Sequence, residues 1–322
     1  IGNMAGALIV FSINIILIRN LLSRNFSLVR LGELLRFGFP LIFAAIFTWI
    51  LQISDRILLQ QLASIEEVGL YSLGSRFSSI LTIAIIGPFS TAWGAYCFQI
   101  ALKENAKKTY ARIASYWLLI LTFFGLVLIL FSPLAIELMA AEVFWNAQNV
   151  VLPLVYMGIV FGMYSLVDLG INIVKKTKYM AYIVCVGATL NILLNILLIP
   201  KLGMLGSAYA SLVSFALMLL ITYQISQNLY FIPFEKRRLL KIGILFCVIS
   251  LAAQFVEIDN IIVDLLVKFI FLGLYVVGVF AARFLYPDEQ AYLTNAYQHL
   301  RANRGILNKL RLGFAMLRGS IN

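Results

Sequence analysis

Long apolar runs alternate with short polar segments over most of the 322 residues. A hydrocarbon core of about 30 Å is crossed by about 20 apolar helical residues, and by this measure about nine segments qualify as membrane spans. They cover residues 4–22, 37–62, 69–99, 110–131, 150–173, 179–199, 204–225, 240–256 and 261–284. The pattern therefore predicts an all-α fold, a polytopic membrane helix bundle with about nine transmembrane helices.

The polar segments between the spans differ in charge. Basic residues gather in every second segment, and the positive-inside rule makes the side that they share cytoplasmic, so the chain begins outside and its C-terminus lies inside. These segments hold Arg19, Arg24, Arg30, Arg36, Lys103, Lys107, Lys108, Arg112, Lys175, Lys176, Lys178, Lys236, Arg237, Arg238 and Lys241. The opposite segments carry Glu66, Glu67, Glu137, Glu142, Glu257 and Asp259.

Composition excludes a soluble domain, because 62% of the residues are hydrophobic and only 12% are charged. The net charge of +11 fits membrane orientation better than binding to nucleic acid, since the basic residues lie in short segments between spans. Cys97, Cys185 and Cys247 stand alone in apolar runs, so the sequence predicts no disulfide framework, metal site or cofactor.

Charged residues inside the spans are the first candidates for function, since a charge in lipid is costly. Arg76 lies about 10 Å inside the outer end of span 69–99. It can snorkel outward, pair with Asp55, or face a cavity and meet a phosphate, to which the guanidinium fork is well suited. Asp55 and Arg56 lie near the outer end of span 37–62, where a solvated cap is the simplest interpretation of the residues alone.

Span 69–99 is also too long to cross straight, since its residues would reach about 46 Å as a helix. Gly87 and Pro88 mark the point where we expect it to break, because proline removes a backbone donor and clashes with the preceding turn. The break is either a static kink or the hinge by which the protein changes its opening.

Three more polar positions lie within spans. Asp168 is a lone carboxylate that either carries a coupling proton or is neutralised by Lys175 or Lys176. Asn191 and Asn195 share one face of a helix, where amides either hold helices together or bind cargo. Asp264 and Lys268 are four residues apart, and an intrahelical ion pair accounts for both of them.

Three segments carry a family resemblance: SDRILLQQLASIEEVGLYSLGSR, PFSTAWGAYCF and NILLNILLIPKLGMLGSAYAS. They resemble the Wzx-type polysaccharide flippases of the multidrug and oligosaccharidyl-lipid exporter superfamily. The resemblance implies that the chain is the later part of a longer transporter. Residues 1–36 would be the last helix of a first lobe with its linker, 37–230 a six-helix lobe, 231–286 two extra helices, and 287–322 a basic amphipathic tail on the cytoplasmic leaflet.

The resemblance further implies a transporter, not an enzyme, in the cytoplasmic membrane. Its substrate would be a polyprenyl-diphosphate-linked oligosaccharide for surface polysaccharide biosynthesis, with membrane lipids and a coupling ion, proton or sodium, as partners. Arg76, Asn191 and Asn195 are the expected substrate-binding residues. Structural or coupling roles are expected for Asp55, Arg56, Asp168, Gly87 and Pro88. The alternatives are a drug or cation exporter of the same superfamily and a membrane glycosyl polymerase or ligase.

Overall fold

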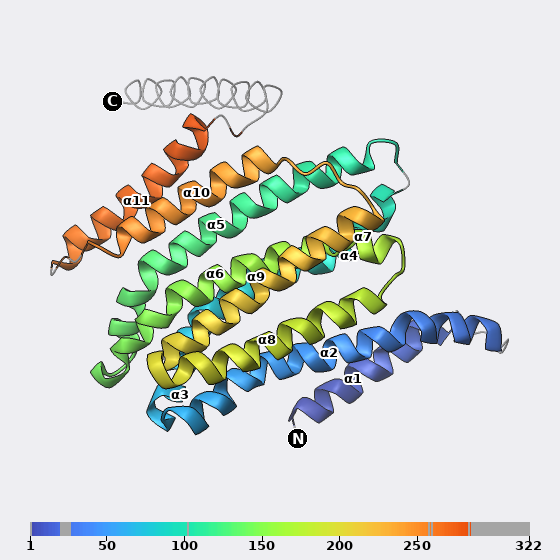
Figure 1. The fold of residues 1–322 in the computed structure, drawn as a ribbon, viewed down its shortest axis with the longest axis horizontal. Helices are drawn as coiled ribbons and strands as arrows, with labels where there is room; N and C mark the ends of the chain where they lie inside the picture. The colour runs from blue at the N-terminus through green and yellow to red at the C-terminus, as the bar shows by residue number, and fades with distance from the viewer. Residues whose placement is uncertain are drawn as a thin grey trace, which may run out of the picture.

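The computed structural model describes residues 2–19, 27–101, 103–256, 258, 260–282 and 284, and within them every regular element is a helix. Figure 1 shows long helices packed side by side in a slanted bundle. The all-α polytopic fold is thereby confirmed. The predicted amphipathic tail, residues 287–322, and residues 20–26 at the first basic segment lie outside the described residues.

The helices follow the predicted spans closely. Their bounds are α1 Gly2–Ile18, α2 Leu28–Leu62, α3 Ile65–Ile80, a π-helical segment Leu81–Ile86, α4 Gly87–Ala101, α5 Ala106–Met139, a 3-10 segment Glu142–Val150, α6 Val151–Val167, α7 Leu169–Ile173, α8 Lys178–Leu202, α9 Met204–Leu229, α10 Lys236–Ala253 and α11 Ile261–Ala281. Each span predicted from the sequence coincides with one helix or with several in a row.

Seven helical stretches within the described residues are long and apolar enough to cross a membrane: Leu28–Leu62, Ile65–Ala101, Ala106–Met139, Glu142–Ile173, Lys178–Leu202, Met204–Leu229 and Ile261–Ala281. The two other predicted spans, 4–22 and 240–256, are helical but fall short of this standard. The α1 helix ends at Ile18, and α10 has 18 residues of which the first three are basic.

The α2 helix begins well before the predicted start at residue 37, because Ser27 caps it. The backbone N–H of Arg30 donates a 3.4 Å hydrogen bond to the Ser27 hydroxyl, and the helix then runs from Leu28 to Leu62. An N-cap of this kind satisfies a backbone donor at the helix start. The basic segment that the sequence assigned to a linker is therefore partly the first turns of a membrane helix.

Helices α8 and α9 form a tight hairpin that packs against α2 on one side and α6 on the other. Glycines permit this approach. A Cβ at Gly206 would lie 2.5 Å from the Leu198 carbonyl oxygen, and one at Gly187 would lie 2.3 Å from the Met218 sulfur. Without a hydrophobic driving force between helices in lipid, such close packing is a main source of stability.

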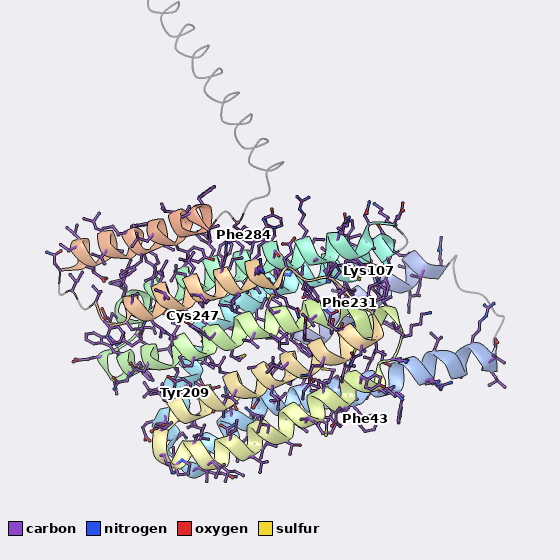
Figure 2. All side chains as sticks on the ribbon, turned by 45° about the horizontal axis from the view of Figure 1, so that its top comes forward. Phe43, Lys107, Tyr209, Phe231, Cys247 and Phe284 are labelled. Atoms are coloured by element: carbon purple, nitrogen blue, oxygen red, sulfur yellow. The ribbon has the colours of Figure 1, made fainter. Side chains whose placement is uncertain are left out.

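Many large apolar side chains point outward from the bundle, as Figure 2 shows. Phe39, Leu197 and Val277 are 59%, 63% and 64% exposed. Such a surface suits contact with lipid acyl chains rather than water, in agreement with the membrane assignment.

The connections between helices lie at two opposite ends of the bundle, as the alternating charges predict. Figure 1 shows the turns from α2 to α3, from α8 to α9 and after α5 at one end, which we call the acidic end. The connections from α4 to α5, from α7 to α8 and from α9 to α10 lie at the other, the basic end. Figure 2 labels Lys107 and Phe231 there.

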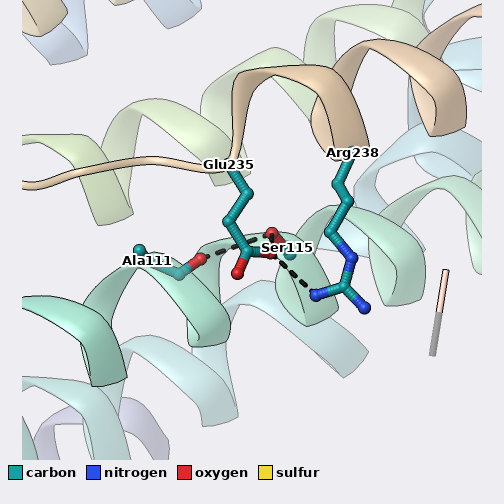
Figure 3. A network of polar contacts seen from close by, with 4 residues as sticks. All are labelled: Ala111, Ser115, Glu235 and Arg238. Atoms are coloured by element: carbon teal, nitrogen blue, oxygen red, sulfur yellow. Dashed lines mark hydrogen bonds and ion pairs between the residues drawn. The ribbon is translucent and has the colours of Figure 1, made fainter. Parts of the chain in front are cut away.

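A polar cluster attaches the start of α10 to α5 at the basic end (Figure 3). The Glu235 carboxylate accepts a 2.7 Å hydrogen bond from the Ser115 hydroxyl on α5 and a 2.8 Å ion-paired bond from Arg238. The Arg238 guanidinium lies 4.5 Å from the centre of the Phe284 ring, and Lys241 donates to the Ala282 carbonyl. Helix α10 is therefore fixed to α5, and to the end of α11, at this end.

Candidate functional site

The candidate site is centred on Asp55, a carboxylate buried in the middle of the lobe with 5% of its surface exposed. Its Oδ1 accepts hydrogen bonds from Asn195 at 2.8 Å and Asn191 at 3.3 Å. Its Oδ2 accepts from Ser211 at 2.6 Å and from the Tyr71 hydroxyl at 2.8 Å. Helices α3, α8 and α9 thus all meet α2 at one carboxylate.

A second set of hydrogen bonds orients these donors. The Ser54 hydroxyl donates to Asn191 Oδ1 at 3.0 Å, and Asn195 Nδ2 donates to the same oxygen at 3.1 Å. Asn191 also donates to Ser211 at 3.1 Å. Asn191 and Asn195 are fully buried on one face of α8, as their spacing predicts. One polar atom of this cluster, Asn195 Oδ1, is buried and has no hydrogen-bond partner.

Asp55 forms no ion pair among the residues that the structure describes. The ion pairs within the described part of the chain are Arg238–Glu235 and Lys268–Asp264, and all four donors to Asp55 are neutral amides or hydroxyls. The second pair, at 2.6 Å, confirms the intrahelical bridge predicted for α11. A buried carboxylate without a counter-charge is costly and tends to bind a proton or a cation. The amide and hydroxyl oxygens around it are hard ligands that suit an alkali or alkaline-earth cation.

A cavity of about 300 Å³ opens beside Asp55, between α2, α3, the π-helical segment, α6 and α9. Its polar lining comes from Gln52, Asp55, Arg56, Tyr71, Ser75, Arg76, Ser78, Ser79, Thr82 and Ser211, and its apolar lining includes Leu154, Met157, Phe161 and Phe215. Arg56 donates a 3.3 Å hydrogen bond to Ser75, which connects α2 to α3. Arg56 and Arg76 are both exposed on this wall.

Arg76 forms no ion pair with Asp55 in this structure, although the sequence left that pairing open. Four neutral donors already occupy the two Asp55 oxygens. Arg76 lies instead on the cavity wall. Of the three alternatives considered for it, this position favours contact with a ligand in the cavity.

The expected break at Gly87 and Pro88 takes an unexpected form. The helix continues through both residues, but the six residues before them, Leu81–Ile86, are π-helical, and the Gly87 N–H donates to the Thr82 carbonyl five residues back. Proline lacks the N–H for the next bond, which weakens the α-helical pattern on its N-terminal side. A π-turn of this kind is frequent at functional sites. Thr82 and Ile83, within it, line the cavity.

Asp168 lies apart from this cluster, at the bend between α6 and α7, and is half-buried. Its backbone carbonyl accepts from Ile171 at 2.9 Å and from Asn172 at 3.2 Å. It makes no ion pair with Lys175 or Lys176. The structure therefore brings together Asp55, Arg56, Arg76, Asn191 and Asn195, and it leaves Asp168 outside the group.

Sequence reasoning missed Tyr71, Ser211, Ser54 and Ser75 as members of this site. Each of them carries a single hydroxyl group. One hydroxyl in a membrane span is a weak indication of a functional site. Their positions become informative only when α3 and α9 are seen to meet α2.

In sequence, a family model matches the N-terminal third of the chain, and in structure, a known protein matches most of it. Residues 1–101 match the family model described as polysaccharide biosynthesis protein. MJ1068, an uncharacterized membrane protein of Methanocaldococcus jannaschii, is 23% identical over 216 residues, which are 63% of this chain and 42% of the relative.

Two solved structures match parts of the chain, and the first of them is similar in fold. The lipid II flippase MurJ, in an inward closed conformation, matches with a TM-score of 0.62 at 15% identity over 81% of this chain and 57% of that one. An outward-facing multidrug resistance transporter of the MATE family gives a TM-score of 0.44 at 18% identity over 69% and 53%. The chain thus spans about half the length of the proteins that it matches.

Proposed function

We propose, from the match of residues 1–101 to a polysaccharide biosynthesis family model and from the likeness in fold to the lipid II flippase MurJ, that this protein moves a polyprenyl-diphosphate-linked oligosaccharide across the cytoplasmic membrane for surface polysaccharide biosynthesis. The headgroup would cross inside a cavity that opens to each side in turn, while the lipid tail stays in the bilayer. The basic end of the bundle, with the C-terminus, would face the cytoplasm.

The observation that carries this proposal is the charge of the cavity wall. Arg56 and Arg76 are exposed on it. Asp55 lines the same cavity, but both oxygens of its carboxylate already accept hydrogen bonds from neutral neighbours. Paired guanidinium groups are suited to a diphosphate, because each can bind two oxygens. An exporter of cationic drugs would need the opposite arrangement, with a carboxylate open to the cavity.

We place the coupling ion, sodium or a proton, at Asp55 within this proposal. The carboxylate forms no ion pair with any described residue, and the unpartnered Asn195 Oδ1 lies in the same buried cluster. A cation between these oxygens would satisfy both. Asp55 and Arg56 are adjacent on α2. Binding of the ion at the buried cluster and binding of the headgroup in the cavity would therefore be linked through this helix.

The test is transport by the full-length protein in liposomes. Three lipids with the same polyprenyl tail and oligosaccharide are compared, carrying a diphosphate, a monophosphate or no phosphate. We expect the rate to follow the negative charge, with the diphosphate transported fastest. Equal rates for all three would contradict an arginine-based site, and efflux of a cationic dye in place of the lipids would favour the exporter.

Substitution of a basic residue outside the cavity controls for general charge effects. Lys201, at the end of α8, is exposed and does not line the cavity. Lys201→Ala should leave the preference for diphosphate unchanged.

A further inference from the structure

A second and larger cavity, of about 450 Å³, lies at the acidic end, away from Asp55. Its walls are the last turns of α5, the start of α6, the end of α10 and the first half of α11. The polar groups that line it are Glu137, Gln148, Asn149, Gln254, Asp264 and Lys268. At about 30 Å³ per water molecule, this volume equals roughly 15 waters, far more than a few ordered waters need.

The cavity exists because the two extra helices spread away from the lobe. Near the basic end α11 is well packed: Tyr275 is buried and shares a 2.7 Å hydrogen bond with Thr122 on α5, and Val279 is buried too. Toward the acidic end, residues 261–274 of α11 include none that is buried. Figure 1 shows α10 and α11 diverging from α5 and α6 in this direction.

Charges of both signs line the cavity near the acidic end of the bundle. Asp264 and Lys268 form their 2.6 Å ion pair in the first two turns of α11, about 5–10 Å from its start. The Lys268 side chain is only 14% exposed. Glu137, from α5, adds a second carboxylate. Leu266, Phe269 and Ile270 on α11 are each about 60% exposed, so acyl chains can cover the helix surface beside the cavity.

We propose that this cavity binds the headgroup of a zwitterionic phospholipid with a primary ammonium, a phosphatidylethanolamine. The ammonium meets Glu137 and Asp264, the phosphate meets Lys268, and the amides of Gln148 and Gln254 meet the ester and glycerol oxygens. The headgroup fills the space between the lobe and α11, and its acyl chains run along α11. A headgroup with one charge of each sign matches two carboxylates and one ammonium better than an anionic one does.

The test uses the full-length protein in nanodiscs of phosphatidylcholine, to which a second lipid is added. Added phosphatidylethanolamine should raise the midpoint temperature of thermal unfolding, and native mass spectrometry should show one such lipid retained. Phosphatidylglycerol should bind roughly tenfold more weakly, because it has the phosphate but no ammonium group to meet the two carboxylates. Free phosphoethanolamine should give no shift, since it lacks the acyl chains that bring the headgroup to this depth.

Variants locate the site. Glu137→Gln and Lys268→Gln should each lower the retention of phosphatidylethanolamine about tenfold, while Glu66→Gln, an exposed position at the same end outside the cavity, should not. Equal retention of phosphatidylglycerol, or retention of phosphatidylethanolamine unchanged in both cavity variants, would overturn the proposal. Absence of any retained lipid would show a cavity filled by water alone.

Discussion

Ser211 on α9 donates a 2.6 Å hydrogen bond to Asp55 on α2, although the two residues are 156 positions apart in the chain. Asn195 on α8 donates to the other oxygen of the same carboxylate at 2.8 Å. Asp55 is therefore both the point where the helices of the lobe meet and the proposed site of the coupling ion, and these two roles predict different responses to mutation.

Asp55→Asn should destabilise the protein and remove its response to sodium. The NH2 group of the new amide would face groups that already donate hydrogen bonds to Asp55. Each buried donor left without an acceptor lowers the free energy of unfolding by about 1–3 kcal/mol. Thermal unfolding in sodium chloride and in choline chloride separates the effects. The wild type should unfold at a higher temperature in sodium, because a ligand of the native state stabilises it, and the variant should unfold at the same temperature in both salts.

Asp168→Asn is the matched control, since Asp168 is the other carboxylate considered for coupling. It lies at the α6–α7 bend without an ion pair, so its substitution should leave the sodium response intact. If Asp168→Asn abolishes ion dependence and Asp55→Asn does not, the coupling site lies at α6–α7.

Arg76→Ala should abolish transport of the diphosphate-linked substrate with little loss of stability. Arg76 is exposed on the cavity wall and is not paired with Asp55, so its removal leaves no buried charge unpaired. Exposed substitutions of this kind change stability by about 0.5 kcal/mol or less. Arg76→Lys should keep part of the activity, because the charge remains while the fork is lost. Transport in liposomes, measured beside thermal unfolding, checks both expectations. Unfolding of Arg76→Ala would instead show a structural role.

The sequence alone was sufficient to predict the helices and the alternation of their connections between the two ends of the bundle. An apolar run long enough to cross a membrane can satisfy its backbone hydrogen bonds in lipid almost only as a helix. Asp264 and Lys268 were predictable as a pair for a similar reason, since contacts four residues apart are fixed by the helix itself. Asn191 and Asn195 were placed on one face in the same way.

The site was only partly predictable, because it depends on which helices pack together. Asp55 meets Asn191 and Asn195 across 136 and 140 positions, and no local pattern specifies that contact. The interpretation of Asp55 as an outer cap followed from its place near a helix end, but packing of α8 and α9 buries it. The π-helical segment was also not predictable, since proline and glycine indicate a weak point without specifying the register that results.

Gly203→Ala should destabilise the hairpin between α8 and α9. Gly203 has φ of +56° and precedes Met204, whose N–H donates to the Glu67 carboxylate. An added Cβ would lie 2.3 Å from that carboxylate, and a non-glycine residue in this conformation costs about 1–3 kcal/mol. Gly94→Ala is the control, because a Cβ there meets nothing within 4 Å. Thermal unfolding should separate the two variants, and equal midpoints would contradict this account of the turn.

Cysteine labelling should place the basic end in the cytoplasm. In a variant without Cys97, Cys185 and Cys247, single cysteines at Glu104 and Lys176 should react with an impermeant maleimide only after the membrane is opened. A cysteine at Ala141, at the acidic end, should react in intact cells. Labelling of positions 104 and 176 from outside would reverse the predicted orientation.

The π-helical segment before Gly87 should act as the hinge of the lobe, and a deletion tests this better than a substitution. A π-turn holds one more residue than the α-helical turn it replaces. Restoring the missing N–H with Pro88→Ala leaves that extra residue in place. Converting the turn to α-helix without a deletion would rotate α4 by about 100° and expose Trp93, Cys97 and Ile100, which are buried. We therefore expect Pro88→Ala to keep the π-turn.

Deletion of Ile83 removes the extra residue and keeps the buried face of α4 in register. Ile83 is 74% exposed, so little packing is lost with it. The deletion variant should fold, with unfolding temperature unchanged or raised, and should transport several times more slowly, because hinges change rates through the few residues that absorb the dihedral change. Spin-label distances between α3 and α4 would verify that the helix is now regular. Transport at the normal rate in a protein with that regular helix would show that the π-turn is a static feature of the fold.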